Sequence, residues 1–388
     1  MAHEITAREI LDIPAAWKGS TFDFRERALR VFTPAEVDEL EAAVRHLRGL
    51  GEFDLPDVTP ATFPLPTLAP RMARMADELR HGSGVVLLRG IPRERFSADD
   101  IGLVYYGLGV HMGRPLAQSY LGELLGSVID VSDVEETPRG YHAGGRQGFH
   151  TDGSACDIVG LMCLRGAKSG GASRIVSAVA LRNALVERRP EFADAIYDGY
   201  YYRKMDNDAK YGRGMYLTKE PVAVFAEGGG EFFCNLNGGD IRRAVEKGDA
   251  TLSPLQAEAY DELQKLAASP EFHLDMDIGE GDIQFLNNRT ILHSRLGYDD
   301  HPELARRRHM LRIWLEVPGW PARPPRQMVM TTEDCTRWAT RRTPRMELPS
   351  VYLGEMQRQL GEREKAGTVL PLLKPYEVST VKHMATAG

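Results

Sequence analysis

The pattern of apolar and polar positions divides the chain into a helical N-terminal part and a β-rich centre. Residues 33–36 (Thr-Pro-Ala-Glu) have the order of an N-cap, a first-turn proline and an N3 glutamate, and apolar positions follow at 37, 40, 44 and 47. This spacing predicts an amphipathic helix that ends at Gly49 and Gly51. We also predict helices over residues 70–81 and from Ser97 to about 107–113, with a buried strand over 84–90.

From about residue 117 the pattern changes to short apolar runs separated by glycine turns, which are typical of β-strands. The predicted strands cover residues 158–164, 173–177, 223–226, 232–236, 273–278, 282–286 and 309–317. Helical patterns interrupt them at 178–189 and 253–268, and a further helix is predicted near 354–366. Because strands and helices seldom alternate, an antiparallel sandwich or jelly roll is favoured over a Rossmann sheet. We therefore expect a mainly β core with helical decoration at both ends.

Composition narrows the class of protein. The 388 residues carry a formal net charge of −7, which argues against nucleic-acid binding because such proteins usually have a basic excess. No apolar run approaches the roughly 20 residues that a membrane span requires, and the first residues lack the apolar centre of a secretion signal. Four irregularly spaced cysteines make a disulfide framework improbable. We expect a cytoplasmic enzyme or binding protein with no membrane or nucleic-acid partner.

The clearest local motif is His150-Thr151-Asp152. Side chains at positions i and i+2 of a strand point to one face, so His150 and Asp152 can reach a common point. An imidazole and a carboxylate placed in this way make two-thirds of the 2-His-1-carboxylate triad of non-haem Fe(II) oxygenases. The motif is short enough to arise by chance, and a surface histidine next to a turn aspartate is the alternative.

Two later segments could complete such a site. His293 follows a glycine turn and an apolar strand, where it could be a third ligand or simply a polar residue near the core. Arg308 and Arg312 lie four residues apart, so on a strand both project from the same face. Two buried cations are costly without anionic partners, and a dicarboxylate cosubstrate and an acidic substrate would supply them. A solvated basic edge strand is the alternative.

Taken in this order, the three segments resemble the Fe(II)/2-oxoglutarate-dependent dioxygenases of the taurine dioxygenase (TauD/TfdA) family, within the clavaminate synthase-like group. The resemblance runs through residues 84–89, 150–152, 170–173, 281–293 and 308–314. It implies a double-stranded β-helix (a jelly-roll, cupin-like core) with the metal inside its mouth. The implied organisation is an N-terminal extension over 1–83, a dioxygenase core over 84–318 and a C-terminal extension over 319–388.

The resemblance also implies roles for individual residues. His150, Asp152 and His293 match the iron ligands, and Arg308 matches the arginine that binds the distal carboxylate of 2-oxoglutarate. Ser173 follows a double glycine where the family commonly has a threonine that touches this cosubstrate, although a turn serine is the alternative. The gap between His293 and the arginines is longer than in the shortest members, so Arg307 or Arg306 could take the assigned place, although a one-residue slip would turn the side chain to the opposite face.

The expected reaction uses Fe(II), 2-oxoglutarate and O2, and it releases succinate and CO2. The carboxylate at Asp152 excludes the halogenase variant of this chemistry, which leaves hydroxylation, desaturation or oxidative cyclisation. The competing possibilities are a jelly-roll protein that binds a metal or sugar without O2 chemistry, and a Zn-dependent hydrolase at the same triad.

The substrate is expected to be a small carboxylate-bearing metabolite, anionic or zwitterionic, such as an amino acid or a derivative. A sulfonate would also fit. Arg312 matches a position that binds the substrate's acidic group in some members, with an internal pair to Asp157 as the alternative. The other predicted substrate-binding residues are Gln118, Tyr120 and Arg295. A tyrosine-rich segment near 200–216 is either part of a lid or a strand packed on the core, and a homo-oligomer is possible.

Overall fold

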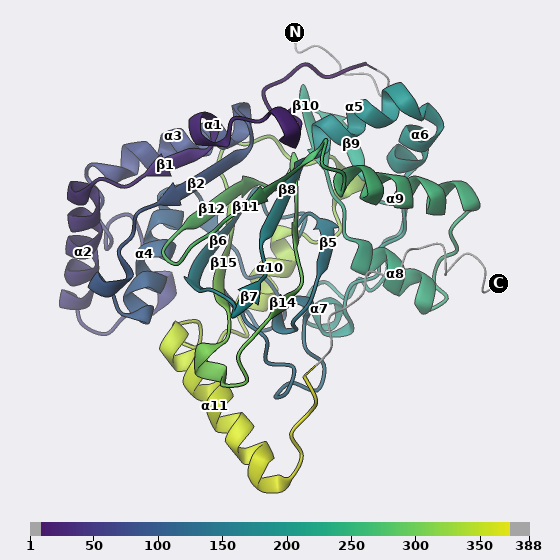
Figure 1. Cartoon of the computed structure of the whole chain (residues 1–388). Helices are drawn as coiled ribbons and strands as arrows, with labels where there is room; N and C mark the ends of the chain where they lie inside the picture. Colours follow the sequence, from purple (N-terminus) through teal and green to yellow (C-terminus); the bar gives the residue numbers. More distant parts are fainter. Residues whose placement is uncertain (1–8, 373–388) are drawn as a thin grey trace.

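Two antiparallel β-sheets form the centre of the computed structural model, which describes residues 9–372 (Figure 1). The large sheet has the strand order β1-β2-β12-β6-β15-β3, with β4 also paired to β15, and only its β1–β2 pair is parallel. The small sheet has the order β11-β8-β13-β5. The strands of the large sheet are β1 (Leu29–Val31), β2 (Val85–Arg89), β3 (Arg114–Pro115), β4 (Leu125–Val128), β6 (Ile158–Arg165), β12 (Ile283–Asn287) and β15 (His309–Glu316). Those of the small sheet are β5 (Gln147–His150), β8 (Ser173–Ser177), β11 (His273–Met276) and β13 (Ile291–Arg295).

Two short antiparallel pairs complete the strands. They join β7 (Ser169–Gly170) to β14 (Tyr298–Asp299), and β9 (Phe225–Gly228) to β10 (Glu231–Cys234). The eight-residue strands β6 and β15 pair along most of their length, with Leu311 opposite Met162 and Trp314 opposite Val159. This pairing places the predicted arginine strand in the interior of the large sheet rather than at its edge.

Helices cover the outer faces of both sheets. On the large sheet α3 (Leu68–His81) packs on β2 and β12, and α4 (Ala98–Val110) packs on β6 and β15, with α2 (Pro34–Gly49) on α4. On the small sheet α5 (Ala178–Arg188) packs on β8 and β13, and α9 (Pro254–Ala267) packs on β5 and on α6 (Pro190–Asp198). The remaining helices are α1 (Phe24–Arg27), α7 (Asp206–Tyr211), α8 (Gly238–Glu246), α10 (Thr332–Ala339) and α11 (Pro349–Ala366). Because each sheet is covered on its outside, the inner faces are left to build a site between them.

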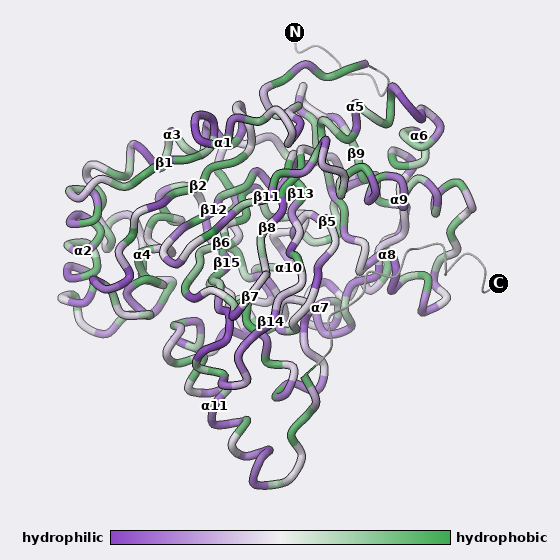
Figure 2. Tube along the Cα trace, in the orientation of Figure 1, coloured by the Kyte–Doolittle hydropathy of each residue, from purple (hydrophilic) through white to green (hydrophobic). Residues whose placement is uncertain are grey.

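Hydropathy follows this layering. Figure 2 shows many hydrophobic residues along the strands of the large sheet, whereas α11, which projects from the body of the molecule, is largely hydrophilic. The inner side of α11 packs on a small apolar cluster around Ile129, Val131 and Leu304. Among residues 9–372, none of the helices combines the length and apolar character that crossing a bilayer requires.

The mainly β prediction is confirmed, and the predicted helices at 34–49, 70–81, 178–189 and 253–268 are present within two residues at each end. The last predicted helix is α11, which begins five residues earlier than expected, at Pro349. Five α-helices were not predicted, namely α1, α6, α7, α8 and α10. Strand β1, which lies in the segment predicted as an N-terminal extension, pairs with β2 and so joins the large sheet. The proposed division at residues 84 and 318 stays a prediction.

Candidate active site

A cavity of about 540 Å³ receives side chains from both sheets. Strands β5 and β13 contribute the two predicted histidine ligands, and β15 contributes Met310, Arg312 and Trp314. These three side chains alternate along the strand, so one face of β15 forms a wall of the cavity. The start of α8 also lines the cavity, and so does Met330, which belongs to the segment predicted as a C-terminal extension.

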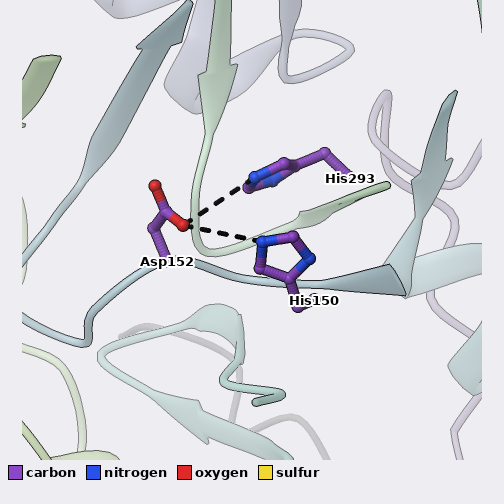
Figure 3. A group of neighbouring side chains, drawn as sticks. All are labelled: His150, Asp152 and His293. Atoms are coloured by element: carbon purple, nitrogen blue, oxygen red, sulfur yellow. Dashed lines mark ion pairs between the residues drawn. The ribbon is translucent and has the colours of Figure 1, made fainter. Parts of the chain in front are cut away.

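The register of the small sheet brings the predicted metal ligands together. His293 on β13 lies directly opposite His150 on β5, and Asp152 follows two residues after His150. The Oδ1 atom of Asp152 is 3.7 Å from Nε2 of His150 and 3.8 Å from Nε2 of His293 (Figure 3). One potential ligand atom from each residue lies within 4.8 Å of the others. The structure therefore converges the three side chains on a single point.

The charge states of these groups suit a divalent cation. Nδ1 of His150 lies 2.8 Å from the carbonyl oxygen of Gly148, so it carries the proton and leaves the Nε2 lone pair free. Burial, together with the charge of His150, lowers the pKa of His293 to about 3, so its imidazole is neutral at neutral pH. Burial acts to raise the pKa of Asp152, but the charge of Arg312, together with the neighbouring histidines and the Trp314 N–H, outweighs it and holds the pKa below its ordinary value. Imidazole nitrogens of two histidines and one carboxylate oxygen are the donor set of the Fe(II) facial triad, so the residues fit this metal.

Asn288 holds the turn that carries Asp152. Its Oδ1 accepts a hydrogen bond from the Asp152 backbone N–H at 2.8 Å, and its Nδ2 donates to the carbonyls of Asp152, Gly153 and Cys156 at 3.0–3.3 Å. The sequence analysis missed this residue. Its signal was a pair of asparagines between two apolar strands, where an amide is buried only if it is hydrogen-bonded.

Arg308 extends into the cavity without a protein anion. Arg308 is only 8% exposed. Its guanidinium makes no hydrogen bond or ion pair with any residue between 9 and 372, and it lies 5.5 Å from the ring centre of Tyr298. Arg307, on the opposite face, pairs with Asp133 at 2.6 Å, and Arg306 is exposed and pairs with Glu303. The structure thus places Arg308, rather than either neighbour, on the cavity face. Ser173 lines the cavity as well, 3.5 Å from Nε2 of Gln284.

Arg312 has an internal partner, but the partner is not Asp157. Asp157 accepts hydrogen bonds from Arg289 and from the backbone of Val317, so the alternative considered from the sequence is wrong. Arg312 instead donates from Nε to Oε1 of Gln118 at 2.7 Å, and its Nη1 lies 3.4 Å from Oδ2 of Asp152. Gln118 also lines the cavity, and its side chain holds the Arg312 guanidinium through this hydrogen bond.

The other predicted substrate-binding residues have structural contacts of their own. Arg295 lines the cavity, but its Nε and Nη2 donate to the carbonyls of Gly145 and Ala143, each at 3.0 Å, so it fixes the loop that leads into β5. Tyr120 does not line the cavity. Its ring stacks on that of Tyr211, with the two ring centres 6.0 Å apart. In the tyrosine-rich segment, Tyr202 is buried and donates to the carbonyl of Asn235, as expected for a segment packed on the core.

The cavity has a marked excess of positive charge. Eight arginine and lysine residues line it, against three aspartates, in a protein of net charge −7. Each aspartate pairs with one of these cations: Asp152 with Arg312, Asp208 with Arg139, and Asp240 with Arg243. Besides Arg308, only Arg146 among the lining cations has no partner within the described chain, and it is exposed at the edge of the cavity, four residues before His150. The sequence analysis missed Arg146 because an exposed arginine in a loop has no distinguishing pattern.

Residues 47–314 match the family described as "Taurine catabolism dioxygenase TauD, TfdA family". The chain belongs to the TauD/TfdA family. The FR-33289 synthase of Streptomyces rubellomurinus is similar to this chain, with 30% identity over 72% of this chain and 81% of the synthase. The taurine hydroxylase-like protein SAT17 of Stachybotrys chartarum is 28% identical over 77% of each chain.

Solved structures share the fold at low sequence identity. Asparagine oxygenase in complex with Fe(II), 3-hydroxyasparagine and succinate matches with a TM-score of 0.58 and 16% identity, covering 74% of this chain and 93% of that one. The non-heme iron oxygenase OrfP in complex with Fe, succinate and (3S)-hydroxy-L-Arg matches with a TM-score of 0.56 and 16% identity, covering 74% and 94%. The jelly-roll core expected of this TauD/TfdA protein is confirmed.

Family membership decides between the competing functions. This TauD/TfdA protein is an Fe(II)- and 2-oxoglutarate-dependent dioxygenase, and the His-Asp-His triad is present in the cavity. A metal- or sugar-binding protein and a Zn-dependent hydrolase are no longer needed to account for the triad. Its substrate is a small molecule.

Proposed function

We propose that this dioxygenase oxidises a C–H bond of a small metabolite that carries an anionic group, such as the carboxylate of an amino acid or of an amino-acid derivative. The observation that carries this proposal is the excess of cations in the cavity next to the triad. A desolvated carboxylate, sulfonate or phosphate is stabilised by such surroundings, whereas a cationic substrate would be repelled.

In the proposed mechanism His150, Asp152 and His293 hold Fe(II) on one face. The bound metal, with 2-oxoglutarate and O2, supplies an oxidant strong enough to remove hydrogen from an unactivated C–H bond. Arg308 binds the distal carboxylate of 2-oxoglutarate, because it is a buried cation that no anion of the described chain neutralises. The Ser173 hydroxyl lies on the same cavity wall and donates to that carboxylate. Because Asp152 occupies the carboxylate position, the outcome is hydroxylation, desaturation or oxidative cyclisation.

Arg146 is the cation that we assign to the substrate. Six of the eight lining cations are engaged by carboxylates, carbonyls or an amide of the protein, including Arg242 through Glu246 and Lys204 through Asp334. If Arg308 takes the cosubstrate, Arg146 is the remaining cation without a partner between residues 9 and 372. Its place at the exposed edge of the cavity suits a group that enters from solvent.

A cytoplasmic location is part of the proposal. The four cysteines are all buried and free, which suits a reducing compartment. A homo-oligomer stays a prediction.

A metabolite screen tests the proposed function. The purified enzyme with Fe(II), 2-oxoglutarate and O2 is incubated with a library of anionic, zwitterionic and cationic metabolites, and succinate release is measured together with product masses. We expect stimulation by anionic or zwitterionic compounds, with a product mass that shows one added oxygen or two lost hydrogens. Stimulation by cationic or uncharged compounds alone would contradict the proposed substrate class.

A further inference from the structure

We propose that Arg312 and Trp314 position the metal-binding carboxylate of Asp152. This inference rests on the proposed function, because it concerns the same metal site. It goes beyond it by assigning the second oxygen of Asp152 to two side chains of β15.

The two oxygens of Asp152 have different surroundings. Oδ1 faces the Nε2 atoms of both histidines, at 3.7 and 3.8 Å. Oδ2 accepts a hydrogen bond from Nε1 of Trp314 at 2.6 Å and lies 3.4 Å from Nη1 of Arg312. One oxygen is therefore directed to the metal position, and the other is held by donors on β15.

Arg312 is itself held on three sides. Its Nε donates to Oε1 of Gln118 at 2.7 Å, and its guanidinium lies 4.4 Å from the ring centre of Tyr141 and 5.1 Å from that of Trp314. The Gln118 amide is oriented by its own donations to the carbonyls of Leu124 and Arg312, at 3.2 and 2.9 Å. A guanidinium stacked between two aromatic rings and hydrogen-bonded to a fixed amide is pre-organised toward Asp152.

A single-oxygen ligand has a specific consequence for this site. With three protein ligand atoms, the bound metal would keep sites for 2-oxoglutarate and O2. If Asp152 rotated and bound through both oxygens, it would occupy one of those positions. Donors on Oδ2 prevent the rotation and fix the direction of Oδ1, and loss of such outer contacts typically weakens metal binding by about 10–100-fold.

The test measures Fe(II) affinity rather than turnover. Trp314→Phe keeps an aromatic ring beside Arg312 but removes the N–H donor, and Arg312→Leu removes the cation. Trp17→Phe is the matched control, because Trp17 is buried and its Nε1 donates to the carbonyl of Ser83 at 2.8 Å, away from the cavity. Anaerobic competition with a chelator gives the Fe(II) dissociation constant of each protein, and the visible charge-transfer band with 2-oxoglutarate reports the coordination.

We expect Fe(II) binding to weaken by about 10–100-fold in Trp314→Phe and in Arg312→Leu, with a shifted or weaker band, and to stay within about twofold in Trp17→Phe. Unchanged Fe(II) affinity in both cavity variants would overturn the inference, as would unchanged affinity in Arg312→Leu alone. If Arg312→Leu does not fold, Trp314→Phe decides. Failure of the proposed function is separate, because it would appear in the metabolite screen as stimulation by cationic or uncharged compounds alone and would leave the Fe(II) affinities of these variants unaffected.

Discussion

Three neighbouring arginines show how the direction of a side chain decides its role. Arg306 is exposed, and Arg307 is buried in a pair with Asp133. Arg308 is buried in the cavity, where no carboxylate among residues 9–372 pairs with it. Both residues lie just before β15, which begins at His309, and their different surroundings give adjacent residues of one type different roles. Arg307 stabilises the fold, whereas we propose that Arg308 binds the cosubstrate.

Substitution separates these two roles. We expect Arg308→Leu to raise the 2-oxoglutarate requirement by tens- to thousands-fold, because truncating a charge-assisted pair in a shielded site costs about 2–5 kcal/mol. Arg307→Leu leaves the Asp133 carboxylate without its partner and should reduce the stability of the fold by about 3 kcal/mol, with little change in the requirement. Steady-state kinetics and urea unfolding of both variants check this. A large kinetic effect in Arg307→Leu with a change below about threefold in Arg308→Leu would show that the register is wrong.

Arg146 gives a prediction about the substrate. We expect Arg146→Gln to raise the KM for the primary substrate about tenfold with kcat nearly unchanged, because a rim cation contributes binding energy equally to the ground and transition states. Arg45→Gln, an exposed arginine on α2, is the control and should change neither constant. Equal KM values for the Arg146 variant and the control would remove Arg146 from the substrate site.

At the scale of elements, the turn between β12 and β13 holds the turn that carries Asp152, through hydrogen bonds from the Asn288 side chain. We expect Asn288→Ala to weaken Fe(II) binding and to lower stability by about 1–3 kcal/mol, because buried backbone groups at Asp152 and its neighbours lose their partners. Asn287→Ala is the matched control. Asn287 is also buried, but its Nδ2 donates to the carbonyl of Leu79 on α3. Its loss should lower stability without changing Fe(II) affinity, and equal effects of the two variants on iron would contradict the account.

The sequence predicts elements where one signal is strong. The strand at 173–177 appears with the predicted bounds, and the capping box at Thr33 and Glu36 begins α2 as expected. Helix α8 was missed because its first residues, Gly238 and Gly239, are typical of a turn, although the Asn237 side chain caps them. Helix α6 was missed because only Arg189 separates it from α5.

The sequence predicted some residues of the site but not the contacts between them. The triad could be found because His150 and Asp152 lie in one short motif and His293 follows a glycine turn and an apolar strand. Arg308 was assigned only through the family resemblance, since the gap before the arginines left Arg306 and Arg307 as alternatives. The partner of Arg312 could not, because strand periodicity gives the face of a side chain and not which of several carboxylates lies opposite. The contacts of Asn288 with the Asp152 turn join residues 136 positions apart, and no local pattern reports such a pairing.

At the scale of the whole molecule, buried histidines make stability depend on pH. Burial, together with nearby positive charge, lowers the pKa of His309 to about 3, whereas an unfolded histidine has a pKa of about 6.5. Below about pH 6.5 the unfolded state therefore binds a proton that the folded state excludes. The stability that this group contributes is complete above pH 6.5 and is lost as the pH falls toward 3.

Between pH 6 and 4.5 the unfolding free energy of the wild-type protein should fall as the pH falls. We expect His309→Gln to reduce the slope of this fall by up to about 1.4 kcal/mol per pH unit. Urea unfolding of the iron-free protein at several pH values measures this slope. His46→Gln, at an exposed position of α2, is the control and should retain the wild-type slope. A wild-type slope in His309→Gln as well would show that His309 is not kept neutral by the fold.

We expect the cavity between the two sheets to hold Fe(II) through His150, Asp152 and His293, with 2-oxoglutarate beside it on Arg308. An anaerobic titration of the wild-type protein with Fe(II) and 2-oxoglutarate tests this most directly, because chelation by 2-oxoglutarate gives a visible charge-transfer band. We predict a band that saturates at equimolar iron and cosubstrate, that disappears in His150→Ala and Asp152→Ala, and that requires far more 2-oxoglutarate in Arg308→Leu. A folded wild-type protein that gives no band, or a band unchanged by these substitutions, would contradict the account.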